Sequence, residues 1–251
     1  HAAAVLFPTF NFKTFMMILV CLFFKVHQPY RLKKYQAKDI DVCHSYEDEA
    51  ADRESINQLA DQCCLPANEI IYEQIVQQNG KFKISFSISG IVLELFQHYR
   101  PDVIHSFKKL AATGCIEFLA ETYYHSLSSL YSATEFQRQV LKHAELIKSL
   151  FAMEPVVFKN TELIHDNRIA SLIGGLGLKG ILCEGVERIL KGRSCNKVYA
   201  VPGQEEPGLL LRNATLSDDI AFRFGDPNWS EHPLTADKFA EWLHHHQPGN
   251  T

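Results

Sequence analysis

Carboxylate side chains lie in or directly after three short apolar segments of this sequence, at Glu117, Glu162 and Glu184. Two carboxylates are the minimum that hydrolysis of a glycosidic bond requires. One attacks the anomeric carbon or activates a water molecule, and the other donates its proton to the leaving oxygen. The spacing in the sequence does not show which pair lies at the separation that this chemistry needs. A single glutamate after a strand is more often a solvated surface residue, so this reading depends on its neighbours.

Histidine, amide and tyrosine side chains accompany these carboxylates. His27 and Gln28 follow the first apolar run, and His125 ends the polar segment Glu121–His125 that comes after Glu117. If the strands before these segments are parallel neighbours, the side chains meet at the carboxyl edge of one sheet. Carboxylates and amides match pairs of sugar hydroxyls, and aromatic rings match the apolar face of a pyranose. The set therefore favours a hydroxyl-rich ligand.

Two other kinds of site remain open. His27, Glu117 and His125 could ligate zinc, because neutral imidazole and carboxylate both suit this ion. No HExxH spacing supports that interpretation. A Ser/His/Asp hydrolase is disfavoured only by the lack of a GxSxG elbow, and the lack of a P-loop argues against a nucleotide site.

Apolar segments with strand character alternate with helical segments at least four times, which predicts a parallel sheet covered by helices. No glycine fingerprint follows the first strand, so a barrel is favoured over a dinucleotide-binding fold. Val156–Phe158 reads as a strand buried on both faces, and Glu162 then lies where barrel enzymes carry their chemistry. The expected strands lie near Met17–Phe24, Phe82–Ile88, Cys115–Ala120, Pro155–Phe158, Gly180–Cys183, Val198–Val201 and Leu209–Arg212. The expected helices lie near Pro66–Val76, Ile91–His98, Pro101–Thr113, Ser132–Phe151, Thr235–Leu243 and after Asp166.

The apolar run Phe15–Phe24 near the N-terminus imitates the hydrophobic part of a signal peptide. It is too short to cross a bilayer, and no small-residue cleavage site follows it. We therefore expect a buried first strand from about Met17. Residues 1–16 would then be an extension outside the fold, and residues 17–251 a single domain.

The net charge and the cysteine content limit which partners and which cellular compartment can be expected. The 251 residues carry a net charge of −4, so the chain has no excess of positive charge to attract nucleic acid. We expect neither nucleic acid nor membrane as a partner, and the oligomeric state stays open. The seven cysteines have no CxxC spacing, and Cys21, Cys115 and Cys183 lie inside apolar runs. This usage favours a reducing compartment, and we expect the cytoplasm.

Three segments together resemble the first motifs of glycoside hydrolase family 57, in the same order and at similar spacing. They are His27–Pro29, Gly114–Leu119 and Phe158–Leu163. The segments Leu65–Asn68, Phe86–Gly90, Phe118–Ser126, Gly180–Gly185 and Leu216–Phe224 are especially similar to the α-amylase and α-amylase-like branch of that family. The similarity extends from about Met17 to the C-terminus.

The resemblance implies an incomplete (β/α)7 barrel and a retaining glycoside hydrolase of the α-amylase type. The implied substrates are α-1,4-glucans such as starch, glycogen and maltodextrin. Glu162 is the implied nucleophile that forms the glycosyl-enzyme, and no cofactor or metal is implied. The implied substrate-binding residues are His27, Gln28, Glu117, His125, Glu184, Asp218 and Asp219.

The sequence departs from the family pattern near its C-terminus. The family's acid/base is an aspartate on a later strand, and Asp218, Asp219 and Asp237 do not lie in the expected motif. We therefore expect a fragment without its proton donor, its last strands and its C-terminal helical region. Such a fragment would bind glucan weakly and be inactive by itself.

Three alternatives to hydrolysis stay open. A 4-α-glucanotransferase or branching enzyme of the same family would use a sugar hydroxyl in place of water. A catalytically silent relative would bind glucan without turnover. A metal-dependent carbohydrate deacetylase on a similar barrel is the third alternative.

Overall fold

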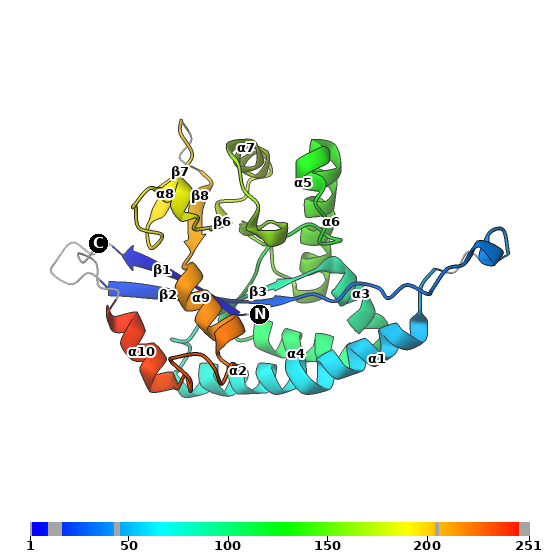
Figure 1. The fold of residues 1–251 in the computed structure, drawn as a ribbon, viewed down its shortest axis with the longest axis horizontal. Coiled ribbons are helices and arrows are strands. Elements are labelled where there is room, and N and C mark those ends of the chain that lie inside the picture. The colour runs from blue at the N-terminus through cyan, green and yellow to red at the C-terminus, as the bar shows by residue number, and fades with distance from the viewer. Residues whose placement is uncertain (1, 10–16, 43–45, 204–205, 246–251) are drawn as a thin grey trace. The chain divides into compact units, whose positions relative to one another are not determined.

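The structure is a computed structural model that describes residues 2–9, 17–42, 46–203 and 206–245 (Figure 1). The chain divides into two compact units. The first unit comprises the residues up to Lys25, Ile84–Ser87 and the residues from Val156 onward, and the second comprises Val26–Lys83 and Ile88–Pro155. The described strands form two four-stranded sheets, and helices alternate with them along the chain, which confirms the α/β class.

The first sheet has the strand order β1-β2-β3-β4. β2 (Met17–Val26) begins where the sequence places the first strand, and β3 (Ile84–Ile88) and β4 (Ile116–Phe118) lie inside their predicted ranges. In β3, the apolar residues of the alternating pattern are buried, which is the property that made the strand recognisable.

Part of the predicted N-terminal extension has regular structure. β1 (Ala2–Thr9) pairs antiparallel with β2, from Ala2 opposite Phe24 to Thr9 opposite Met17. Residues 10–16 lie outside the described residues. The boundary of the domain at residue 17 stays a prediction, which limited proteolysis of the N-terminus checks.

The second sheet belongs to the first unit and has the order β5-β6-β8-β7. β5 (Val157–Lys159), β6 (Gly180–Glu184) and β8 (Gly208–Arg212) are parallel, as the sequence predicts, and β7 (Val198–Ala200) runs antiparallel to β8. The helices of this unit are α7 (Asn167–Gly175), α8 (Glu187–Leu190), α9 (Ala214–Asp218) and α10 (Ala236–His245). Because β5, β6 and β8 share one direction, their carboxyl ends lie at one edge of this sheet.

The second unit is largely helical. α1 (Glu49–Leu59) and α2 (Leu65–Gln77) are joined by a π-helical turn over Ala60–Cys64 and run on as one long segment (Figure 1). α3 (Gly90–Tyr99) and α4 (Pro101–Ala111) follow β3, and α5 (Ser128–Tyr131) and α6 (Ala133–Phe151) follow β4. α4 packs against α2, α3 and α6. The core of this unit includes the fully buried side chains Phe96, Phe107, Phe118 and Phe136.

Two predicted helix starts have the expected capping contacts. The backbone N–H of Glu135 donates to Ser132 Oγ at 3.3 Å at the start of α6, and the N–H of Ile169 donates to Asp166 Oδ1 at 2.7 Å at the start of α7. A short polar side chain at this position satisfies a backbone donor that the helix leaves without a partner.

The burial of two predicted core segments differs from the prediction. Val156 lies before β5 and is 45% exposed, and within β5 Val157 is half-buried whereas Phe158 and Lys159 are buried. Cys21 is exposed, whereas Cys115 and Cys183 are buried as predicted. In both cases the segment is apolar as the sequence indicates. Sequence alone, however, does not show which face of the strand a neighbouring element covers.

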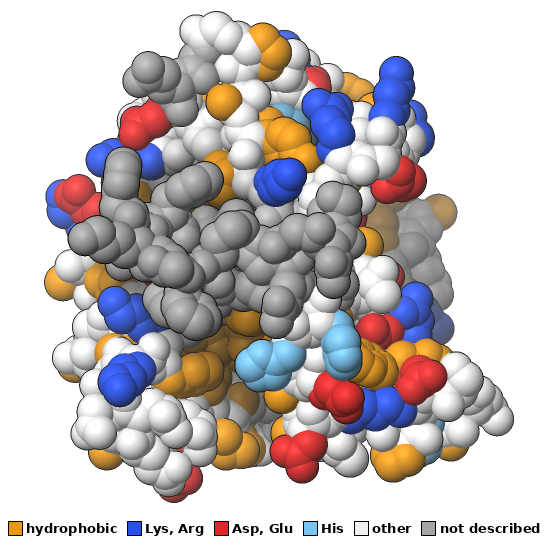
Figure 2. Space-filling view, turned by 90° about the vertical axis from the view of Figure 1, so that its left-hand side faces the viewer, with side chains coloured by type: hydrophobic (Ala, Val, Ile, Leu, Met, Phe, Trp, Pro, Cys, Tyr) orange, Lys and Arg blue, Asp and Glu red, His pale blue; other side chains and the backbone are white. Residues whose placement is uncertain are grey.

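On the face drawn in Figure 2, neither positive nor negative charge predominates. Basic and acidic side chains both occur there in several places among apolar ones. Among the described residues, every helix is too short or too polar to cross a membrane.

Candidate active site

Glu162 lies just beyond the carboxyl end of β5, in a turn with unusual backbone conformation. Its φ is 51°, and the next residue, Leu163, has a φ of 56°. Left-handed conformations are unfavourable for residues with a side chain, and they cluster at functional sites. The side-chain amide of Asn160 donates to the carbonyl of Ile164 at 2.9 Å and so ties the turn across its base.

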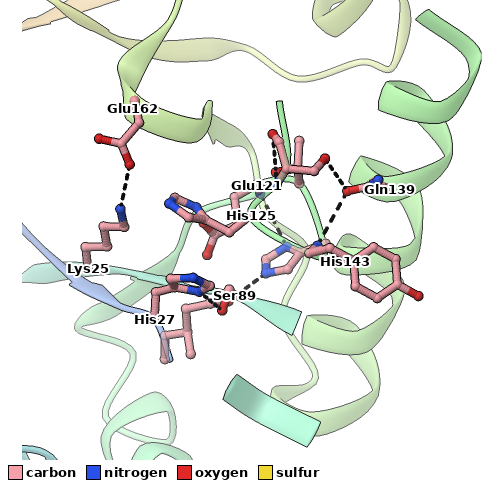
Figure 3. A network of polar contacts seen from close by, with 12 residues as sticks. Lys25, His27, Ser89, Glu121, His125, Gln139, His143 and Glu162 are labelled. Atoms are coloured by element: carbon pink, nitrogen blue, oxygen red, sulfur yellow. Dashed lines mark hydrogen bonds and ion pairs between the residues drawn. The ribbon is translucent and has the colours of Figure 1, made fainter. Parts of the chain in front are cut away.

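The Glu162 side chain extends from this turn toward Lys25, near the end of β2 (Figure 3). Lys25 Nζ lies 3.2 Å from Glu162 Oε1, and the Glu162 side chain is 66% exposed. The turn therefore presents a carboxylate to solvent with a cation beside it. A glutamate presented to solvent in this way could act as a nucleophile in its ionised form.

Two further predicted acids of this unit share one arginine. Glu184 ends β6 and lies opposite Arg212 in the register with β8. Arg212 Nε donates to Glu184 Oε2 at 2.8 Å, and Arg212 Nη1 donates to Asp218 Oδ1 at 2.7 Å. Asp219 instead accepts from Arg223 at 2.5 Å. The structure therefore brings Glu184 and Asp218 together and gives Asp219 a separate partner.

In the second unit, two predicted histidines lie against each other. The rings of His27 and His125 are 4.3 Å apart between centroids, with an angle of 42° between their planes. His27 Nδ1 lies 2.8 Å from Ser89 Oγ, and His125 Nδ1 lies 3.7 Å from Glu121 Oε2. The Glu121 side chain is only 1% exposed. His125 has a φ of 52°, so the loop after β4 also contains a left-handed turn at a predicted site residue.

A tyrosine pair in the same unit shares the carboxylate of Glu94. Tyr30 donates to Glu94 Oε2 at 3.2 Å, and Tyr123 donates to Glu94 Oε1. Burial, together with the charge of Glu94, raises the pKa of Tyr30 to about 12 and raises the pKa of Tyr123 well above its usual range. Both phenols are therefore protonated near neutral pH and act as hydrogen-bond donors. Gly90 makes room for the Tyr123 ring, because a Cβ at this position would lie 2.6 Å from it.

Glu117 and Gln28 are the remaining predicted binding residues. Glu117 is the central residue of β4 and is half-buried, so it lies within the strand, as the sequence predicts. Gln28 accepts hydrogen bonds from the Arg31 guanidinium at 2.9 and 3.2 Å when its amide oxygen faces that group. Within the described part of the chain, no group of three or more His, Cys, Asp or Glu side chains is arranged to hold a metal ion.

The sequence reasoning missed several residues that hold these side chains. Arg212 was visible as the basic end of a predicted strand. His143 lies on the same helical stripe as the buried residues Phe136, Val140 and Ile147, so its burial could have been predicted from spacing. Ser89 and Lys25 carry no sequence signal of their own, because their role depends on what lies opposite.

Comparisons with known proteins identify the family of the chain. Residues 21–251 match the sequence profile of glycosyl hydrolase family 57. A protein of Methanocaldococcus jannaschii named "Putative alpha-amylase" is 42% identical over 228 residues, which are 90% of this chain and 48% of that protein. The chain thus spans about half the length of this curated relative.

Two solved structures share the fold at low sequence identity. A 4-α-glucanotransferase from Thermococcus litoralis superposes with a TM-score of 0.67 at 15% identity, over 91% of this chain and 31% of that one. The α-amylase AmyC from Thermotoga maritima superposes with a TM-score of 0.57 at 11% identity, over 79% of this chain and 46% of that one. The profile match over most of the sequence and the 42% identical relative lead to one conclusion: the chain belongs to glycosyl hydrolase family 57.

Proposed function

We propose that this chain is part of a retaining glycoside hydrolase that acts on α-1,4-glucans, with Glu162 as the nucleophile. The observation that carries the proposal is the exposed Glu162 carboxylate, which a left-handed turn presents beyond a parallel strand and beside Lys25. In a retaining mechanism, an ionised carboxylate attacks the anomeric carbon, the glycosidic bond breaks, and a covalent glycosyl-enzyme forms. Water then cleaves this ester. The name of the Methanocaldococcus jannaschii relative supports an α-glucan substrate.

The other predicted residues are proposed as contacts to the sugar. They are His27, Gln28, Glu117, His125, Glu184, Asp218 and Asp219. Arg212 donates hydrogen bonds to both Glu184 and Asp218, and we assign these two carboxylates to hydrogen bonds with sugar hydroxyls rather than to proton donation. The general acid would then be another group. General acid help contributes roughly 10²–10⁴-fold, and without it we expect the chain to turn over natural glucan very slowly.

The fold proposed for the whole enzyme is a (β/α)7 barrel, of which this chain contributes a part. The parallel strands β5, β6 and β8 and the superposition on the Thermococcus litoralis structure support that proposal.

The test is a product assay on maltoheptaose with two variants. We expect at most a very slow release of reducing ends from the unmodified chain, and no release above background in Glu162→Gln. Glu154→Gln is the matched control, because Glu154 is also an exposed glutamate paired with a lysine, Lys148. Equal rates in Glu162→Gln and Glu154→Gln would remove Glu162 from the mechanism.

Transfer to a sugar acceptor is the second candidate, which the superposition on a 4-α-glucanotransferase favours. Hydrolysis increases the number of reducing ends, whereas transfer redistributes chain lengths at a constant number of ends. A silent glucan-binding protein would bind maltoheptaose equally well before and after Glu162→Gln and release no product in either case.

A further inference from the structure

His143 is a buried histidine on α6 that bonds to two separate segments of the second unit. Its Nδ1 accepts the backbone N–H of Glu121 at 3.3 Å, and its Nε2 lies 2.8 Å from the carbonyl oxygen of Ile88 (Figure 3). Ile88 is the last residue of β3, and Glu121 lies in the loop after β4. The ring therefore links the ends of two strands through their backbones.

Only one protonation state of His143 makes both hydrogen bonds. A backbone N–H can only donate, so Nδ1 must carry no proton, and a carbonyl can only accept, so Nε2 must carry one. Complete burial lowers the pKa of His143 and so favours this neutral form. Glu121 and the Ile88 carbonyl oppose that shift without reversing it.

The two segments that His143 links are the ones that hold the histidine pair. Ile88 directly precedes Ser89, whose hydroxyl bonds His27, and the Glu121 carboxylate lies beside His125. We propose that His143 is a positioning residue that sets the distance between the two segments and thereby the stacking of His27 on His125. The role in sugar binding rests on the proposed function, whereas the role in placing the two rings does not.

A second buried side chain on the same face of α6 supports this proposal. Gln139, one turn before His143, accepts from the hydroxyl of Ser126 at 2.8 Å and from the backbone N–H of Tyr124 at 3.5 Å. Gln139 and His143 therefore hold the loop from Glu121 to Ser126 at three residues, Glu121, Tyr124 and Ser126. A helix face with two buried polar groups that both bond the same loop is a scaffold for that loop rather than simple core packing.

The test compares three variants of the full chain by NMR of the histidine ring protons. His143→Leu keeps the bulk and removes both hydrogen bonds, and His143→Gln offers a donor and an acceptor in their place. Val140→Ala is the control, because Val140 is buried on the same face of α6 and makes no polar contact with the two segments. We expect the ring signals of His27 and His125 to move in His143→Leu, to return toward their original positions in His143→Gln and to stay in place in Val140→Ala.

Binding of maltoheptaose gives the readout that depends on function. We expect His143→Leu to weaken binding about tenfold, equivalent to about 1.4 kcal/mol, with recovery in His143→Gln. Unchanged ring signals in folded His143→Leu, or equal shifts in Val140→Ala, would overturn the positioning role. If His143→Leu does not fold, Gln139→Leu removes the neighbouring contacts and must move the His125 signals. Failure of the unmodified chain to bind maltoheptaose would instead count against the proposed function and leave the ring measurement valid.

Discussion

Glu162 and its surroundings show how individual residues place an exposed carboxylate beside a cation. Two successive non-glycine residues adopt left-handed backbone conformations, and a lysine from a distant strand lies beside the exposed acid. At the ends of β6 and β8, Arg212 instead holds Glu184 and Asp218 in place. The two glutamates therefore differ in their surroundings: Glu162 is 66% exposed beside one lysine, and Glu184 shares an arginine with Asp218.

The neutral state of His143 makes stability depend on pH. The pKa of a histidine in the unfolded chain is about 6.5, and that of folded His143 is lower. The unfolded state therefore binds the proton first, so the stabilisation is complete above about pH 6.5 and is lost as the pH falls toward the folded pKa. The free energy of unfolding changes with pH by at most about 1.4 kcal/mol per pH unit for one proton.

Urea unfolding at pH 7.5, 6.0 and 5.0 measures this effect. The free energy of unfolding should depend less on pH in His143→Gln than in the unmodified chain. Identical pH dependence in the two proteins would show that His143 titrates alike in the folded and unfolded states. The pKa of His165 is also lowered by burial, but this residue is present in both proteins, so its contribution cancels in the comparison.

Removal of Arg212 should leave two carboxylates without their common partner. We expect Arg212→Gln to lower the free energy of unfolding by about 1–3 kcal/mol, because the hydrogen bonds involve charged groups and are partly buried. Arg138→Gln is the control, since Arg138 makes a similar double contact to Glu135 at an exposed position. Its loss should be less than about 1 kcal/mol. Equal losses in the two variants, measured by denaturant unfolding, would argue against a special role of Arg212.

The helices and strands were the part of the fold that sequence predicted best. Ser132 and Asp166 mark helix starts because their short polar side chains accept a backbone N–H, and this property is local. The alternation of apolar and polar residues in β3 is a local property as well. The burial of Val156 was predicted wrongly, and β1 was not predicted as a strand, because both depend on what another part of the chain covers.

The cap of α7 gives a direct test of an element that follows the Glu162 turn. We expect Asp166→Ala to lower the free energy of unfolding by about 1 kcal/mol, because the N–H of Ile169 loses its acceptor. Asp166→Asn retains a side-chain oxygen that accepts this hydrogen bond and should remain close to the original stability. Thermal unfolding of the two variants separates the outcomes, and an equal loss in both would assign the effect to charge rather than capping.

For the whole molecule, features that depend on contiguous stretches of sequence could be predicted, whereas contacts between distant residues could not. The family, the α/β class and most element boundaries could be read from the sequence, because motifs and periodic patterns are contiguous. Two pairings could not be read from the sequence: that of His27 with His125 in the second unit, and that of Glu184 with Asp218 through Arg212 in the first. Each pairing joins residues that are distant in the chain. The hydrogen-bond partners of His143 could not be predicted for the same reason, although its spacing along α6 indicates that it is buried.

The most direct test of the central claim is covalent labelling of the nucleophile with 5-fluoro-α-maltosyl fluoride. Fluoride leaves without help from a general acid, so the first half of a retaining reaction can proceed even where proton donation is weak. The fluorine on the ring slows breakdown of the ester, so that the intermediate accumulates. Mass spectrometry of the digested chain should show one maltosyl-type adduct, on the peptide that contains Glu162, and none in Glu162→Gln. An adduct on another carboxylate, an equal adduct in Glu162→Gln, or no adduct at all would contradict the assignment of Glu162 as the nucleophile.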